Sequence, residues 1–145
     1  MPGIEVLVRQ LSTEEAINLV NEAVLEARAR GLAVAAAIVD EVGDLLAYQR
    51  DRRAMPAAGS LARRKAHTAA AFRRDTQAMQ QSVEQGRTSY LAMSSALPLA
   101  GGVRLRVNMT VLGALGIAGA SSTEDAHIAS TVIRRAGFEL EEAEQ

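Results

Sequence analysis

The sequence predicts an α+β domain in which helices pack on an antiparallel sheet. Segments with apolar residues at helical spacing alternate with short apolar runs of strand length. A turn at Gly43 joins two of these runs directly, which favours antiparallel pairing. The 145 residues contain neither an internal repeat nor a linker, so residues 1–145 are expected to form one domain.

The first helix is predicted to begin after Ser12. Ser12 and Glu15 have the spacing of a capping box, in which two side chains satisfy backbone amides reciprocally. The apolar residues that follow at helical spacing are Ala16, Leu19, Val20, Ala23, Val24 and Ala27. Gly31 is expected to end this helix, because glycine suits the C-terminal cap position.

Two strands and a loop come next. Residues 32–40, LAVAAAIVD, are a run of small apolar side chains that suits a buried strand. Residues 45–50, LLAYQR, are predicted to be the second strand of the pair. Asp40 ends the first strand, where a carboxylate can accept backbone N–H groups of the turn. Pro56 and Gly59 mark a loop.

The middle of the chain is predicted to be helical. Residues 60–74, SLARRKAHTAAAFRR, are rich in alanine, the strongest helix former. Thr76 can cap a further helix that runs to about Val83, and Gly86 breaks it. Residues 88–95 are expected to add a turn or two of helix, and residues 98–102 a loop.

The C-terminal part supplies two more strands and a last helix. Residues 103–107 alternate apolar and charged side chains, as a half-exposed strand does. Residues 111–120 are predicted to form a central strand whose glycines indicate close backbone approach. Ser122 and Asp125 repeat a capping pattern before a helix that Gly137 closes. The helix dipole also favours an acid at Asp125.

Composition argues against several classes of function. A net charge of −1 and an aromatic content of 3 % argue against a nucleic-acid binder. The absence of cysteine excludes disulfides and thiolate ligands, and two distant histidines predict no metal site. The N-terminus lacks a signal-peptide pattern, and the longest apolar run is too short to span a bilayer. We therefore expect a cytoplasmic protein without a membrane partner.

The helix around Lys65 is the most informative segment. At about 100° per residue, Lys65 falls on the apolar arc with Ala69 and Phe72, whereas His67 falls among arginines. An inward lysine can send its ammonium along apolar surface to the edge. Alternatively, it binds a ligand carboxylate in a pocket, where it could act as a base or amine nucleophile. Lys65 is thus the candidate catalytic residue, and Thr68, one turn away, could add a hydroxyl to the site.

Other candidate residues each have two interpretations. A central group of basic residues indicates either a solvated face or the mouth of an anionic-ligand site; its members are Arg50, Arg52, Arg53, Arg63, Arg64, Lys65, Arg73 and Arg74. His67 and His127 are interpreted as surface histidines or as heme ligands. Gly101 and Gly102 either form a turn that needs positive φ or offer backbone amides to a ligand.

Five segments together resemble the GlcG/HbpS-like family, whose members are often labelled heme-degrading or heme-binding. They are LSTEEA, VDEVGDLLAYQR, KAHTAAAFRRDT, GGVRL and VLGALGIAGASSTEDAHIA. The resemblance implies a profilin-like fold, with an antiparallel sheet of about five strands flanked by helices. It also implies assembly into a homo-oligomer, a dimer or larger. The family pattern K-A-x-T-A maps onto residues 65–69, which leaves His67 at the variable position.

Further family positions map onto Asp40, Gly43, Gly101, Gly102 and Asp125. In the family, the paired glycines usually lead into Val/Ile-Pro, and Arg104 stands here where proline is expected. The first helix contains no histidine, so the histidines that some relatives use for heme have no evident counterpart in this sequence.

Three functions follow as alternatives. The first is a small-molecule site of a catabolic pathway, near a subunit interface. There Lys65 would bind an anionic oxo- or imino-acid, with Thr68, the Gly101 and Gly102 amides and Arg104 at the rim. Whether this site is catalytic stays open. If it is, proton transfer or hydrolysis fits these groups better than redox chemistry.

The second alternative is a site for heme or another tetrapyrrole. It would need an apolar slot and an axial ligand from His67, His127, Tyr48 or Tyr90. The third is a non-catalytic accessory protein that stabilises a catabolic enzyme.

Overall fold

The computed structural model describes residues 9–141, and the predictions about the N-terminal segment lie outside this range. The helices are α1 (Thr13–Ala29), α2 (Ala58–Phe72), α3 (Thr76–Glu84) and α4 (Ser122–Arg135), with a 3₁₀ helix η1 (Thr88–Ala92). The strands are β1 (Ala35–Asp40), β2 (Leu45–Arg50), β3 (Gly102–Val107) and β4 (Thr110–Ala118). The predicted α+β class is confirmed.

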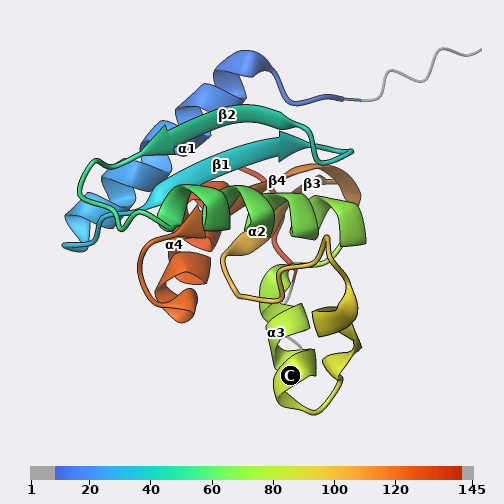
Figure 1. The fold of residues 1–145 in the computed structure, drawn as a ribbon. Coiled ribbons are helices and arrows are strands. Elements are labelled where there is room, and N and C mark those ends of the chain that lie inside the picture. Colours follow the sequence, from blue (N-terminus) through green and yellow to red (C-terminus); the bar gives the residue numbers. More distant parts are fainter. Residues whose placement is uncertain (1–8, 142–145) are drawn as a thin grey trace, which may run out of the picture.

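The strands form one antiparallel sheet in the order β2-β1-β4-β3 (Figure 1). Within residues 9–141 the sheet therefore has four strands, rather than the expected five or so. Beyond β3, the chain near Glu139 meets Arg106 in an isolated bridge. This contact covers part of the β3 edge without becoming a strand.

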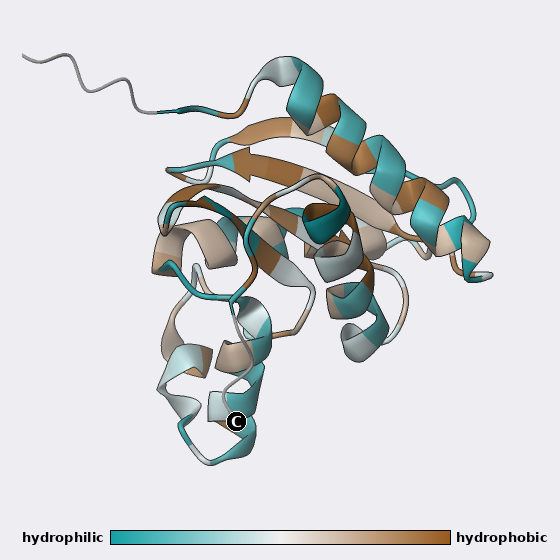
Figure 2. Cartoon of the chain, turned by 180° about the vertical axis from the view of Figure 1, so that it is seen from behind, coloured by the Kyte–Doolittle hydropathy of each residue, from teal (hydrophilic) through white to brown (hydrophobic). Residues whose placement is uncertain are grey.

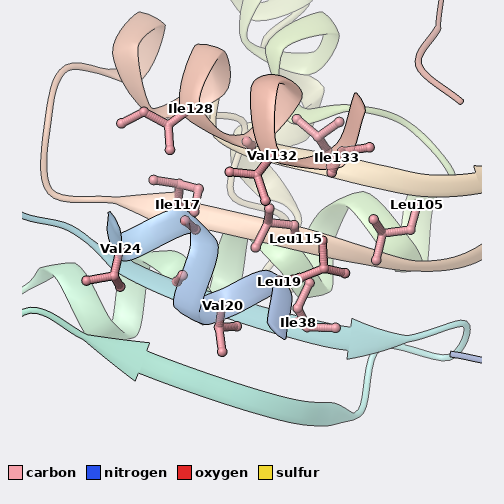
Figure 3. Packing of buried hydrophobic residues seen from close by; sticks show 14 of the residues in the cluster. Leu19, Val20, Val24, Ile38, Leu105, Leu115, Ile117, Ile128, Val132 and Ile133 are labelled. Atoms are coloured by element: carbon pink, nitrogen blue, oxygen red, sulfur yellow. The ribbon is translucent and has the colours of Figure 1, made fainter. Parts of the chain in front are cut away.

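Helices cover the two faces of the sheet unequally. α1 and α4 share one face, where aliphatic side chains of both helices meet those of β1 and β4 (Figure 3). The labelled residues of this cluster are Leu19, Val20, Val24, Ile38, Leu105, Leu115, Ile117, Ile128, Val132 and Ile133. The alternation of hydrophobic and hydrophilic residues along α1 follows from this one-sided burial (Figure 2).

The opposite face belongs to α2 and consists mostly of alanine. Ala62, Ala66 and Ala69 of α2 pack on Ala37 and other small residues of β1 and β4. Small side chains allow the helix backbone to come very close to the sheet. A Cβ atom added at Gly116 of β4, for example, would lie 2.6 Å from the Ala66 amide nitrogen. The glycines predicted to mark close approach do so here.

Strand β2 is left largely uncovered on the α2 side. α2 packs mainly on β4 and β1, and touches β2 only marginally. No residue of β2 is buried. A β-bulge changes its register, because Ile38 pairs with Ala47 whereas Val39 pairs with Leu45. The extra residue, Leu46, brings Leu45 onto the same face as Tyr48.

The ends of the helices follow the sequence with three corrections, of which the first is that α2 begins at Ala58, so Gly59 lies in the helix and not in the predicted loop. The capping box of Ser12 and Glu15 is confirmed. The second box uses Ser121 and Glu124, one residue before the expected pair, because Ser121 is the residue with extended backbone at the start of α4. Thr76 does not cap α3. Its hydroxyl instead bonds Gly102 of the sheet.

Candidate functional site

Lys65 points from α2 into the interior, as the helical arc predicts. Its side chain is 3 % exposed, and its ammonium donates to Asp125 Oδ2 and to the Ile117 carbonyl, both at 3.0 Å. The lysine thus joins α2, on one face of the sheet, to α4 on the other. Its charge already has a carboxylate partner within the chain.

Asp125 is the buried acceptor of this pair. It is 1 % exposed, and its second oxygen, Oδ1, accepts the Ala120 amide at 3.0 Å. Burial raises the pKa of the Asp125 carboxyl, while the nearby Lys65 charge acts in the opposite direction. Sequence reasoning assigned Asp125 to the first turn of the helix but did not pair it with Lys65.

Gly101 and Gly102 lie so close to Lys65 that a side chain at either position would collide with it. A Cβ atom at Gly101 would lie 2.9 Å from Lys65 Nζ, and one at Gly102 would lie 2.8 Å from the Lys65 carbonyl carbon. Gly101 also has a φ of +132°, which side chains rarely adopt. The Gly102 amide donates to Thr76 Oγ1 at 2.8 Å, so this amide is used within the chain.

Thr68 and Arg104 also hydrogen-bond other groups of the chain. The Thr68 hydroxyl donates to the Arg64 carbonyl at 2.7 Å and accepts the Leu97 amide at 3.0 Å, so it fastens the 94–99 loop to α2. The Arg104 guanidinium binds Asp75 at 3.0 Å and Glu141 at 2.6 Å. The Arg104 charge, predicted to lie at the rim of the Lys65 site, is therefore neutralised by two carboxylates of the chain.

His67 lies on the outer side of α2, beside an open groove of about 820 Å³ between α2 and β2. Sites for small molecules span about 300–1,000 Å³. The lining residues are Val39, Gly43, Asp44, Leu45, Tyr48, Arg50, Pro56, Gly59, Ser60, Arg63, Arg64, His67, Ser94 and Ser95. The groove exists because α2 leaves β2 uncovered, and the bulge at Leu46 adds Leu45 to its apolar floor.

Three arginines surround this floor. Arg50, Arg63 and Arg64 are exposed, and no carboxylate of residues 9–141 forms an ion pair with them. Only these three members of the basic group identified in the sequence line the groove. Arg53, by contrast, is paired with Asp51.

The ring of His67 is oriented by the β1–β2 turn. Its Nδ1 lies 3.2 Å from the Gly43 carbonyl, which can only accept, so Nδ1 carries the proton. In the neutral ring, Nε2 then has a free lone pair, the form that binds metals. Asp40 holds this turn, since its Oδ1 accepts the Val42 and Asp44 amides at 3.0 Å each. The turn role expected of Asp40 is confirmed.

His127 and Tyr90 lie outside the lining of the groove. His127 Nδ1 is 2.6 Å from Arg30 Nη1, and a guanidinium can only donate. The neutral His127 ring therefore has its proton on Nε2, which leaves no free lone pair. The Tyr90 hydroxyl accepts from Arg74 at 2.5 Å, and its ring packs edge-on against Phe72.

Two features are absent from residues 9–141. No three His, Asp or Glu side chains of this range gather as they would around a metal ion. None of its helices is both long and apolar enough to cross a membrane.

Comparisons with known proteins agree with this architecture. The sequence model of a family described as "Haem degrading protein HbpS-like" matches residues 11–134. Protein GlcG of Escherichia coli K12 is 35 % identical over 92 residues, which cover 63 % of this chain and 69 % of GlcG.

Solved structures are similar over almost the whole chain. A double mutant of HbpS from Streptomyces reticuli is 28 % identical with a TM-score of 0.83, covering 95 % of each chain. PduOC in complex with heme is also 28 % identical, with a TM-score of 0.82, covering 92 % of this chain and all of the other. At 21 % identity, protein ORFY of Klebsiella pneumoniae shares the fold, with a TM-score of 0.83, covering 96 % of this chain and 99 % of ORFY.

Proposed function

The chain belongs to the HbpS-like family of haem degrading proteins, and from this premise we propose that it binds heme in the groove between α2 and β2. A relative of similar fold, PduOC, has been solved with heme. Three features of the groove support a tetrapyrrole: an apolar floor, a rim of cations and an imidazole with a free lone pair. Heme iron commonly takes a histidine as its axial ligand.

The observation that supports this proposal most directly is the hydrogen bond from His67 to Gly43. It leaves Nε2 of His67 as the metal-binding nitrogen, and a carbonyl partner of this kind fixes the orientation of ligating histidines. Of the two histidines, only His67 has this arrangement, since His127 is paired with Arg30 through its acceptor nitrogen. His67 is therefore the proposed axial ligand.

The remaining groups suit the periphery of a heme. Leu45 and the ring of Tyr48 offer apolar surface to the macrocycle. Arg63 and Arg64 project from α2 beside the groove, where guanidinium groups can bind propionate carboxylates in a bidentate manner. The net result is a site for a flat apolar ligand with anionic substituents.

The small acid ligand of Lys65 stays a prediction that differs from this proposal. Asp125 and the Ile117 carbonyl already bind the ammonium, so a ligand carboxylate would have to displace Asp125. The heme groove needs no such displacement. The two sites are distinct. Variants of Lys65 test the acid site, and variants of His67 test the heme groove.

We further propose that the chain forms a homo-oligomer through the edge of β2. Leu45, Leu46 and Tyr48 are exposed along this strand, whose outer edge is unpaired within residues 9–141. Soluble proteins usually protect such an edge with lysine or proline, and LLAYQR contains neither. Self-association would cover the strand beside the groove.

A titration with ferric heme tests the binding proposal. We expect wild-type protein to shift the Soret band of heme. The His67→Ala variant should lose the part of this shift that comes from ligation of the iron by His67. Added imidazole should restore the spectrum of His67→Ala, because the open position accepts an external ligand. His127→Ala should behave as wild type. A His67→Ala spectrum identical to that of wild type contradicts the assignment.

A further inference from the structure

Two glycines leave the space that two groove side chains occupy. A Cβ atom at Gly43 would lie 2.6 Å from His67 Nδ1, and one at Gly59 would overlap the Tyr48 hydroxyl oxygen. Gly43 has a φ of +91°, so its turn requires glycine in any case. Gly59 is different, because it lies in α2 without a positive φ. Its backbone conformation alone does not require glycine.

We propose that Gly59 is a positioning residue, which seats the Tyr48 phenol against α2 and so keeps the groove open. This inference rests on the proposed heme site. Tyr48 comes from β2 and Gly59 from α2, so their contact spans the groove between the two elements. Tyr48 is 42 % exposed and belongs to neither of the two buried hydrophobic clusters. The space at Gly59 therefore decides where the phenol lies.

The contact involves essentially one atom of Tyr48. Apart from the hydroxyl oxygen, the nearest ring atom to a Cβ at Gly59 is Cζ, at 3.4 Å, which is ordinary van der Waals contact. Alanine at this position must displace the phenol. Phenylalanine at position 48 removes the conflict but keeps the ring. The groove lies beside the ring, so a phenol displaced toward it would occupy space that the ligand needs.

The helix itself should tolerate this substitution. Within a helix, alanine is more favourable than glycine. Gly59→Ala should therefore unfold at the same temperature as wild type or higher, as measured by circular dichroism. A loss of binding then reports the position of Tyr48 rather than a loss of fold.

The first experiment measures the position of Tyr48 without ligand. The chain has two tyrosines and no tryptophan, so in a Tyr90→Phe background Tyr48 is the only source of tyrosine fluorescence. We expect Gly59→Ala to change the acrylamide quenching constant of Tyr48 by about two-fold or more. Gln77→Ala, an exposed change on α3, is the matched control and should leave quenching unchanged. Unchanged quenching in Gly59→Ala overturns the positioning role.

The second experiment measures heme binding, with ferric protoporphyrin IX as the probe. We expect Gly59→Ala to raise the Kd about ten-fold, and the double variant Gly59→Ala/Tyr48→Phe to return to within about two-fold of Tyr48→Phe alone. Equal affinity of Gly59→Ala and wild type overturns the inference. So does a double variant as weak as Gly59→Ala. If wild type binds no heme, the proposed function fails, and the quenching result still decides where Tyr48 lies.

Discussion

Lys65 Nζ and Asp125 Oδ2 lie 3.0 Å apart although their residues are 60 positions apart in the sequence. The lysine comes from α2 and the aspartate from α4, which pack on opposite faces of the sheet. Both side chains are almost fully buried. The ion pair therefore links the two layers at the end of β4, where the chain turns into α4.

Removal of Lys65 alone should destabilise the protein strongly. Lys65→Met leaves Asp125 as a buried carboxylate without its cation, which typically costs about 3–5 kcal/mol of unfolding free energy. Urea denaturation measures this loss. The double variant Lys65→Met/Asp125→Asn should regain about half of it or more, since no charge remains buried. A single variant as stable as wild type would show that the pair contributes nothing.

The same double variant tests the small acid ligand predicted for Lys65. It keeps the fold but has no ammonium, so binding of pyruvate, as a probe oxo-acid, should be lost if Lys65 holds the carboxylate. Calorimetry on wild type and the double variant makes the comparison. Binding that survives in the double variant contradicts the role of Lys65.

Asp51 should make stability depend on pH in the acid range. Hydrogen bonds from the Arg53 side chain and amide, and then from Arg28, hold the pKa of the Asp51 carboxyl well below its ordinary value of 3.8. A carboxyl with a lowered pKa stabilises the fold above its unfolded-state pKa, and this contribution is lost as the pH falls. The melting temperatures of wild type and Asp51→Asn should therefore differ at about pH 7, and the difference should shrink progressively between about pH 5 and about pH 1. A constant difference across this range contradicts the prediction.

The arginines of the groove should matter for the propionates of heme. We expect Arg63→Ala and Arg64→Ala each to weaken binding of ferric heme roughly ten-fold, because each removes a charge-assisted contact. Heme dimethyl ester, which lacks the carboxylates, should bind wild type and both variants alike. The Kd values come from Soret titrations at one fixed salt concentration. If the variants lost affinity for heme and for its ester to the same extent, the arginines would have a structural role instead.

A charge on the edge of β2 should reduce self-association. Leu46 is the bulge residue and is 39 % exposed, so Leu46→Lys should change the edge without disturbing the core. Light scattering should give a multimer for wild type and a smaller species for Leu46→Lys. Gln77→Lys, at an exposed position of α3, adds the same charge elsewhere and should leave the mass unchanged. A monomeric wild type at micromolar concentration contradicts the proposed oligomer.

Local patterns in the sequence predicted most of the fold. Capping, glycine placement and helical spacing gave the helices and the inward direction of Lys65, because these features depend on residues within one turn of each other. The partner of Lys65 could not be predicted in this way. Asp125 fits a helix start equally well whether its carboxylate faces water or a distant ammonium.

The groove was harder to predict than the fold. The sequence pointed to Tyr48, His67 and a basic group but did not bring them together. The bulge at Leu46, which decides that Leu45 faces α2, has no local signature in LLAYQR. Gly59 was interpreted as part of a loop, yet it lies in the first turn of α2. Its role depends on the phenol of another strand, which no spacing within the helix reveals.

The close approach of α2 to the sheet makes the two faces unequal in their tolerance of mutation. Aliphatic residues under α1 and α4 can exchange for one another with modest repacking. At Gly116, any side chain would meet the backbone of α2 and require the whole helix to shift. Helix α2 holds both Lys65 and His67. Sequence variants of this chain should therefore change the side chains on the outer side of α2 while the helix itself stays in place.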